Sequence, residues 1–376
     1  MRYAVDAHAI GRKLTGNEVY VRSLLNAFDT VAPDARFLAY VSGNAAAKSL
    51  PRRFETRQIA RNPFVRLGID FPRKLREDRP ALLHVQYTSP LRCPVPTVVT
   101  VHDVSFLQHP EYFTWWRATQ LRITVARSVR QAARVLTISE FARRTIVEAY
   151  GLAPNQITVI PAAANPFFRV ANRAKAIRRV EECYGIREPF ILTVGDLQPR
   201  KNHIRLIGAF ARFVSQNPGT RQHLVIVGKD TWYSDRIKEA ARRSGVADRI
   251  RLIGFVPDEN LLELYNACDC FAFPSLYEGF GLPILEAMAC GRAVVCSNRA
   301  SIPEVAGEAG TAFDPTDEQD MAHALAAILQ DSDRRARAER LGLNRAAQFT
   351  WRKAAEQTLE VYSQVAGQPV RVHATA

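Results

Sequence analysis

Two glutamates eight positions apart, Glu278 and Glu286, flank a glycine-rich turn in the stretch YEGFGLPILE, which spans residues 277–286. Glycines let the backbone of such a turn approach a ligand closely, and free N–H groups at the start of a following helix attract phosphate. A carboxylate repels a phosphate, so glutamates beside an anion site are expected to bind hydroxyl groups. The pattern therefore predicts a diphosphate flanked by sugar or ribose hydroxyls, whereas a glycine-rich turn taken alone is as often only a tight connection.

Two adjacent cations, Arg200 and Lys201, lie in a second stretch, TVGDLQPRKNH, at residues 193–203. The pattern around them is a strand, a glycine turn and the start of a helix. The planar fork of arginine and the point charge of lysine can neutralise a leaving diphosphate, so we expect no metal ion here. The alternative is a pair of solvated charges in front of a helix.

The local pattern also predicts how the two glutamates are held. Residues 269–273 form an apolar run of strand length, and residues 283–289 have the composition of a helix that closes at Gly291. Pro283 suits the first helical position, where its missing N–H would be unpaired anyway. Glu278 is then expected in a strand-to-helix loop, and Glu286 on the first turns of the helix.

The whole chain repeats this order of strand and helix. Strands are expected at residues 2–6, 37–41, 81–85, 97–101, 135–138, 157–160, 190–194, 223–227, 249–253, 270–273 and 293–296. Helical patterns separate most of them. Repeated β-α-β order predicts an α/β protein with largely parallel sheets, whose ligands bind beyond the carboxyl ends of the strands.

A run of proline and small residues at 161–166 interrupts the alternation and predicts two domains. We expect two doubly wound, Rossmann-like domains at 1–168 and 169–350, facing each other across a cleft. A helix at 351–366, capped by Thr350, is expected to return to the first domain. Residues 367–376 are expected to form a loose tail.

The composition is that of a globular protein with an excess of positive charge. The 376 residues are 47% hydrophobic and 23% charged, with a net charge of +14. No apolar run is long enough to span a bilayer and the first residues resemble a strand rather than a signal peptide, so a cytoplasmic location is expected. The charge favours an anionic partner, such as a nucleotide, an anionic lipid surface or a nucleic acid, and the alternative is a solvated arginine-rich surface.

The stretches 195–202, 278–286 and 297–307 together resemble the donor half of the retaining glycosyltransferases of family 4, mannosyltransferases among them. The resemblance extends over most of the chain. It implies the two-domain GT-B architecture, with the nucleotide sugar held mainly by the C-terminal domain and the acceptor by the N-terminal domain. It also implies transfer without a metal ion or a cofactor.

The resemblance assigns roles to the residues of the second domain. Arg200 and Lys201 match the pair that binds the diphosphate, Glu278 matches the glutamate near the hydroxyls of the donor sugar, and Glu286 matches the glutamate that holds the ribose diol. The implied donor-binding set is Gly195, Arg200, Lys201, Gly228, Lys229, Phe255, Val256, Glu278, Phe280, Gly281, Leu282 and Glu286.

In the first domain, His102 follows an expected strand and matches the family's histidine near the donor sugar. It completes an implied catalytic set with Glu278, Arg200 and Lys201. Asp103 and Gly16 are candidates for binding the acceptor. The sequence departs from the family pattern next to Gly16, because Glu18 would repel an anion if its carboxylate pointed inward.

Residues 115–134 combine two tryptophans with several arginines. A basic amphipathic helix with aromatic ends can lie on an anionic membrane, and lipid-linked acceptors are common among the proteins that this chain resembles. The alternative is an ordinary helix with one face in the core and the other in water. At another strand-to-helix junction, Ser139 is expected to cap a helix.

These observations predict a retaining transferase that moves a hexose from a nucleoside-diphosphate sugar to a saccharide or lipid-linked saccharide during surface polysaccharide assembly. The resemblance implies GDP-mannose as the first candidate donor and a UDP-sugar as the second. Peripheral attachment to the inner face of the membrane would accompany a lipid-linked acceptor. Two other classes compete: a non-catalytic sensor of nucleotide sugars, and a nucleic-acid-binding protein. Only the net charge favours the latter, so we expect no nucleic acid partner.

Overall fold

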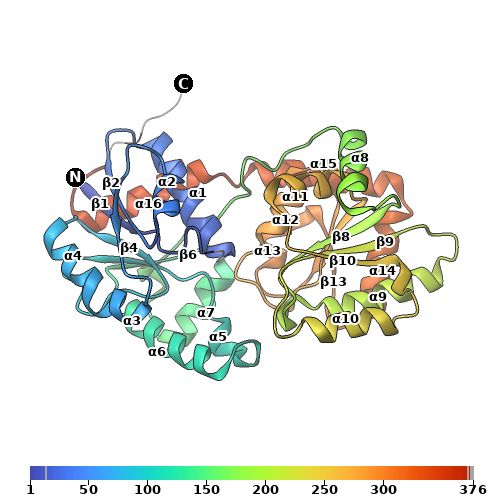
Figure 1. The fold of residues 1–376 in the computed structure, drawn as a ribbon, viewed down its shortest axis with the longest axis horizontal. Coiled ribbons are helices and arrows are strands. Elements are labelled where there is room, and N and C mark those ends of the chain that lie inside the picture. The colour runs from blue at the N-terminus through green and yellow to red at the C-terminus, as the bar shows by residue number, and fades with distance from the viewer. Residues whose placement is uncertain (13–14, 371, 373–376) are drawn as a thin grey trace. The chain divides into compact units, whose positions relative to one another are not determined.

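The computed structural model describes residues 1–12, 15–370 and 372, and its chain divides into two compact units (Figure 1). Unit 1 contains Met1–Ala162 and the segment that begins at Thr350, and unit 2 contains Ala163–Phe349. The division falls a few residues before the expected boundary at 168. Residues 371 and 373–376 of the expected tail lie outside the described part of the chain.

Unit 1 is built on a parallel sheet of seven strands in the order β3-β2-β1-β4-β5-β6-β7. The strands are β1 (Arg2–Asp6), β2 (Arg36–Val41), β3 (Glu55–Gln58), β4 (Leu83–Gln86), β5 (Thr97–Thr100), β6 (Arg134–Thr137) and β7 (Ile157–Val159). The sequence patterns missed β3, because this edge strand, ETRQ, is polar and mostly exposed.

The helical segments of unit 1 connect these strands. They are α1 (Thr15–Val31), α2 (Asn44–Lys48), α3 (Pro63–Val65), the π-helix η1 (Arg66–Asp70), α4 (Phe71–Asp78), α5 (Ser105–Gln108), η2 (Pro110–Tyr112), α6 (Trp115–Gln131), α7 (Glu140–Tyr150), η3 (Pro154–Gln156) and α16 (Trp351–Ala366).

The last helix, α16, packs against α1 in unit 1. Thr350 caps it by accepting a hydrogen bond from the backbone N–H of Lys353. Its Tyr362 is fully buried and bonds Nδ1 of His84 over 2.6 Å. A buried tyrosine with a satisfied hydroxyl anchors the C-terminal helix to the sheet.

Unit 2 is built on a parallel sheet of six strands in the order β10-β9-β8-β11-β12-β13. The strands are β8 (Phe190–Val194), β9 (His223–Val227), β10 (Ile250–Gly254), β11 (Cys270–Phe273), β12 (Val294–Ser297) and β13 (Gly310–Phe313). The edge strand β13 was also missed, since most of its side chains are not buried.

The helical segments of unit 2 are α8 (Arg173–Tyr184), η4 (Pro199–Lys201), α9 (His203–Gln216), α10 (Ser234–Arg243), η5 (Ala247–Arg249), α11 (Asp258–Ala267), α12 (Leu282–Ala289), α13 (Ile302–Ala306), η6 (Gly307–Ala309), α14 (Glu318–Leu329) and α15 (Ser332–Ala347). Helix α12 begins one residue before the expected start, so Pro283 occupies its second position.

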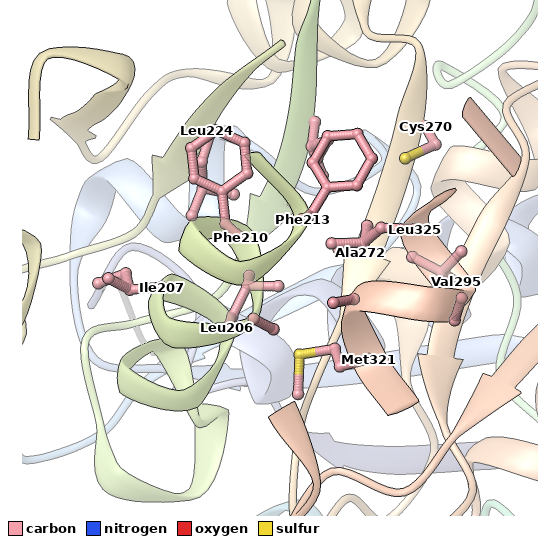
Figure 2. Close-up of a cluster of buried hydrophobic side chains, with 14 of the residues drawn as sticks. Leu206, Ile207, Phe210, Phe213, Leu224, Cys270, Ala272, Val295, Met321 and Leu325 are labelled. Atoms are coloured by element: carbon pink, nitrogen blue, oxygen red, sulfur yellow. The ribbon is translucent and has the colours of Figure 1, made fainter. Parts of the chain in front are cut away.

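The core of unit 2 lies between the sheet and helices α9 and α14. Figure 2 shows Phe210 and Phe213 of α9 facing Leu224 of β9, and Leu325 of α14 beside Ala272 of β11. All of these side chains are fully buried. Apolar burial of this kind fixes the strands whose carboxyl ends carry the candidate site.

Both sheets reverse their direction of growth at one point. In unit 1 the chain moves outward from β1 through β2 to β3 and then returns to the other side of β1 with β4. In unit 2 it moves from β8 through β9 to β10 and returns beside β8 with β11. Loops that leave adjacent strands in opposite directions at such a switch point leave room for a ligand.

Among the described residues, no helix is long and apolar enough to cross a bilayer.

Candidate functional site

The loops after β8 and β11 meet at the switch point of unit 2. The backbone N–H of Leu276, which follows β11, donates to the carbonyl oxygen of Arg200 over 2.8 Å. The stretch 193–203 contributes the first of these loops, and the stretch 277–286 begins in the second. The fold therefore brings the predicted cation pair and the first predicted glutamate together.

Glu278 lies between both predicted cations. Its Oε2 accepts a hydrogen bond from Nη1 of Arg200 at 2.7 Å, and its Oε1 accepts one from Nζ of Lys201 at 2.5 Å. Burial by itself raises the pKa of Glu278, but the charges of Arg200 and Lys201 outweigh it and lower the pKa to about 2. The carboxylate is ionised at neutral pH, and its low basicity makes it a poor general base.

Lys201 is the more deeply buried of the two cations. Its side chain is 11% exposed, whereas that of Arg200 is 26% exposed. Burial lowers the pKa of Lys201, and Glu278 opposes that shift. The ammonium also lies 5.2 Å from the centre of the Phe273 ring, a cation–π contact.

Glycines end three neighbouring strands on this edge of the sheet, where Gly195 follows β8, Gly228 follows β9 and Gly254 closes β10. A Cβ on Gly195 would lie 3.0 Å from Cδ of Lys201, and a Cβ on Gly228 would overlap the carbonyl oxygen of Gly195. Gly254 has a φ of +73°, a conformation that side chains rarely adopt. The missing side chains give the stem of Lys201 its space and let the two loops approach each other.

The turn between the two glutamates has the geometry that the sequence predicts. Gly281 has a φ of +113° and stands at the N-cap of α12. Pro283 has no N–H, and the N–H of Ile284 donates to the carbonyl oxygen of Gly281 over 3.0 Å, so among the first three helical residues only Leu282 has an N–H without a helical partner. The Phe280 side chain is buried and packs edge to face on Phe349. Such a helix start is a favourable place for phosphate.

Glu286 lies on α12 and pairs with a residue that the sequence patterns did not single out. The hydroxyl of Tyr265 on α11 donates to Oε2 of Glu286 over 2.9 Å. Burial raises the pKa of Glu286 to about 7, although the Tyr265 hydrogen bond lowers it and the charge of Asp258 adds to the rise. This carboxyl group changes its charge near neutral pH, in contrast to Glu278.

The residues expected along the base lie after β9 and β10. The ammonium of Lys229 lies 5.2 Å from the centre of the Phe255 ring, and that ring is 59% exposed. Val256 is buried. An exposed aromatic ring with a cation beside it offers a surface on which a flat base can stack.

Three further residues support the site without having been predicted. Asn202 adopts a left-handed conformation and donates from Nδ2 to the carbonyl oxygens of Pro274 and Pro315. Ser301 donates to the carbonyl oxygens of Glu278 and Phe280, and His203 lies 3.1 Å from the carbonyl oxygen of Gly195. Only Asn202 carried a usable signal, since asparagine tolerates the left-handed region better than most residues.

In unit 1, His102 is buried and held by Gln86 at the end of β4. Gln86 donates from Nε2 to the carbonyl oxygen of Asn17 over 3.2 Å, which leaves its Oε1 facing Nε2 of His102 at 2.8 Å. The Nε2–H of His102 must therefore donate, and the neutral ring keeps Nδ1 as its acceptor. Burial lowers the pKa of His102 to about 4, so the ring is neutral at pH 7.

The two candidate acceptor residues have different surroundings. Asp103 accepts hydrogen bonds at Oδ1 from the N–H and the hydroxyl of Ser105, at the start of α5. Gly16 is exposed in the first turn of α1, where a Cβ would meet open space. Glu18 accepts hydrogen bonds from the backbone N–H of Gly11 and from Arg22, so its carboxylate already has partners. Ser139 caps α7 through the N–H of Ala142, as predicted.

Comparison with known proteins decides the family. Residues 13–166 match the family model for glycosyltransferase family 4, and residues 182–345 match that for glycosyl transferases group 1. The Escherichia coli O-antigen chain mannosyltransferase B is 34% identical over 265 residues, which cover 70% of this chain and 69% of that protein. The chain belongs to the family 4 glycosyltransferases. It is therefore an enzyme that transfers a hexose, as the motifs predict.

Two further comparisons concern length and fold. The serotype-specific mannosyltransferase WbdA of Escherichia coli is 30% identical over 276 residues, and this family 4 chain matches only 34% of its length. The structure of Anabaena HepE in complex with UDP and glucose has a TM-score of 0.77 at 21% identity, covering 97% of this chain and 100% of that one. Together with the two parallel sheets, this likeness confirms the predicted α/β class and GT-B architecture. The roles of the individual residues stay predictions.

Proposed function

We propose that this glycosyltransferase moves mannose from GDP-mannose to a saccharide or lipid-linked saccharide acceptor during surface polysaccharide synthesis, with retention of the anomeric configuration. The relatives named as mannosyltransferases support mannose as the sugar, and one of them acts on the O-antigen chain by its name. A UDP-sugar is the second candidate donor.

The observation that carries the proposal is the contact of Arg200 and Lys201 with Glu278 at the switch point. A fork of guanidinium N–H groups and a buried ammonium match the oxygens of a diphosphate. The Glu278 carboxylate accepts hydrogen bonds from both cations. A diphosphate that arrives beside α12 would share these donors with Glu278, and the N–H of Leu282 at the start of the helix would add to its binding.

The role proposed for Glu278 is to orient the donor sugar. A carboxylate with a pKa of about 2 is a weak base and a weak nucleophile, but it accepts hydrogen bonds from sugar hydroxyls well. Bond breaking then depends on charge stabilisation: the bond from the anomeric carbon to the diphosphate oxygen breaks as Arg200 and Lys201 neutralise the leaving group. The acceptor oxygen bonds to the same face of that carbon, and its proton passes to the leaving phosphate oxygen.

The other residues proposed to contact the donor lie beyond the carboxyl ends of the strands of unit 2. Glu286 would accept hydrogen bonds from the ribose hydroxyls, Phe255 and Val256 would lie along the base, and Lys229 would remain beside Phe255. Gly195, Gly228, Gly281, Phe280 and Leu282 would supply close backbone around the phosphates and the sugar.

For unit 1 we propose that His102 contacts a hydroxyl of the donor sugar and that Asp103 and Gly16 bind the acceptor. The neutral ring of His102, with Nε2–H bound to Gln86, has its Nδ1 as an acceptor for such a hydroxyl. If the acceptor is lipid-linked, the enzyme works at the inner face of a membrane.

Thermal-shift measurements with GDP-mannose, GDP, UDP-glucose and UDP test the donor assignment. A ligand at 100 times its dissociation constant stabilises the folded state by about 2.7 kcal/mol, which raises the melting temperature measurably. We expect the largest rise with GDP-mannose, and smaller rises with the uridine nucleotides. An equal response to all four would contradict the choice of base, and no response to any would contradict the donor site.

A further inference from the structure

The large apolar side chains exposed on unit 1 are concentrated in one place. Of nine such residues in its described part, seven lie on α3, η1, α6 and the segment 88–92. We name these seven the apolar patch: Phe64, Val65, Ile69, Leu91, Trp115, Trp116 and Ile123. Phe64, Trp115 and Trp116 are 81%, 74% and 73% exposed. Apolar side chains exposed singly are ordinary, but a cluster of this kind marks an interaction surface.

Hydrogen bonds connect the segment 88–92 to the other two parts of the patch, which are α3 with η1 on one side and α6 on the other. The N–H of Leu91 donates to the carbonyl oxygen of Leu67 in η1 over 2.8 Å. On its other side, the segment 88–92 accepts hydrogen bonds from Arg127 of α6 at the carbonyl oxygens of Ser89 and Pro90. The segment therefore lies between η1 and α6, and it carries Leu91.

Helix α6 has large apolar side chains on two faces. One faces the core through Ala118, Leu121, Val125 and Val129, which are buried. Trp116, Ile123 and Arg130 follow each other at seven-residue intervals, which places them together on the opposite, exposed face. The sequence left two alternatives for this helix: a helix on a membrane surface, or an ordinary helix with one face in the core and the other in water. One face does pack in the core, but the opposite face carries exposed apolar side chains.

The charge around the patch has a single sign over most of its length. Residues 115–131 contain no Asp or Glu, while Arg117, Arg122 and Arg130 are exposed on α6, and Arg92 is exposed beside Leu91. Arginines at the edge of an apolar surface complement a layer of negative charge.

We propose that the apolar patch is the surface by which unit 1 lies on an anionic lipid bilayer. The tryptophans and Phe64 enter the interface between head groups and acyl chains, where amphipathic aromatic rings are favoured. The exposed arginines bind phosphate groups of the surrounding lipids. A protein partner would be expected to bring a mixture of charges, whereas the arginines with no acid on α6 fit a uniformly anionic layer.

This inference deepens the proposed function, since a lipid-linked acceptor would be reached from such a surface. Its test does not depend on that function, because binding to lipid is measured without donor or acceptor. Failure of one can thus be told from failure of the other.

The experiment is co-sedimentation of the full chain with large vesicles of phosphatidylcholine alone or with 30% phosphatidylglycerol. We expect binding to the anionic vesicles, weak binding to the neutral ones, and a blue shift of tryptophan fluorescence on binding. Replacing two apolar anchors, Trp115→Ser with Trp116→Ser, should weaken binding by about tenfold or more, because burial of each indole is lost.

Matched controls lie in unit 2. Trp232→Ser removes a tryptophan that is 64% exposed there, and it should leave vesicle binding and the fluorescence shift unchanged. Arg122→Gln with Arg130→Gln should weaken binding to anionic vesicles about tenfold, whereas Arg242→Gln with Arg243→Gln, the same change of net charge, should have little effect.

Absence of binding to anionic vesicles would overturn the proposal. So would equal losses in the patch variants and their controls, because binding would then not depend on the position of the substituted residues. Binding of the patch to a protein in place of vesicles would overturn it as well. If the chain releases mannose from GDP-mannose but does not bind vesicles, only the proposed membrane surface is wrong. If it binds anionic vesicles but releases no mannose, only the proposed function is wrong.

Discussion

Lys201 donates a hydrogen bond to Oε1 of Glu278 over 2.5 Å, so the buried ammonium of the predicted phosphate pair has a counter-ion within the protein. Arg200 holds the other oxygen of the same carboxylate. One carboxylate thus bonds both cations of the predicted phosphate pair. A bound donor would bring the negative charge of its diphosphate to these cations. Glu278 and the diphosphate would then compete for the hydrogen bonds of Arg200 and Lys201, and this competition should govern the affinity for the donor.

Glu278→Gln should uncouple binding from transfer. With the carboxylate gone, Arg200 and Lys201 lack their anion, so GDP should bind about tenfold more tightly, while transfer should fall by a hundredfold or more. Calorimetric titration with GDP measures the first effect and a donor-consumption assay the second. Glu318→Gln, which removes an ion pair with the exposed Arg212, is the control. Weaker binding of GDP to the Glu278 variant would contradict this account.

Tyr265→Phe should make donor binding depend more strongly on pH. The lost hydrogen bond had lowered the pKa of Glu286, so this pKa should rise above 7, and the protonated carboxyl would accept fewer ribose hydrogen bonds. We expect the Kd for GDP to rise about tenfold at pH 7 and to approach the wild-type value at pH 9. Tyr184→Phe, which removes a hydroxyl bonded to Asn260, is the control. A loss of affinity that is the same at both pH values would argue for a purely structural role of Tyr265.

Gln86→Glu should charge the ring of His102. Burial holds the pKa of this histidine at about 4, below its ordinary value of 6.5, and a carboxylate at the position of the amide would favour the imidazolium. We therefore expect the pKa to rise toward or above 6.5, as followed by proton NMR of the imidazole. A pKa that stays near 4 would show that Gln86 does not face the ring in solution.

The left-handed backbone of Asn202 gives a graded test of the loop that carries the cations. Asn202→Gly keeps the conformation but loses the hydrogen bonds to Pro274 and Pro315, and Asn202→Ala loses both features. The melting temperature should fall in the order wild type, glycine variant, alanine variant. The free energy of unfolding of the alanine variant should be lower than that of the glycine variant by about 1 to 2 kcal/mol. An alanine variant as stable as the glycine variant would refute the role given to the backbone.

The central strands and the charged residues of the site could be predicted from the sequence. Buried strands such as β8 and β11 are apolar runs that the sequence shows directly. The spacing of Glu278, Glu286, Arg200 and Lys201 can likewise be recognised without a structure. The edge strands β3 and β13 were missed because strands at an edge need little apolar surface, so they lack the pattern by which strands are recognised.

The partners of the predicted residues could not be found in this way. Tyr265 lies far from Glu286 in sequence, and Gln86 lies far from His102, so no local pattern connects them. Ser301, which holds the carbonyl groups of the turn after Glu278, is likewise a product of tertiary packing. The charge states of the two glutamates also required the fold, because Glu278 lies between two cations whereas Glu286 bonds a single tyrosine.

The most direct test follows GDP-mannose by proton NMR in the presence of the wild-type chain and of Lys201→Ala. The account predicts slow release of GDP and mannose, with the α-anomer of mannose formed first, since GDP-mannose carries an α-linkage and retention is expected. Lys201→Ala should slow the release by about two to three powers of ten, equivalent to roughly 3 to 4 kcal/mol of lost charge stabilisation. Equal rates in the two proteins, or the β-anomer as the first product, would contradict the account.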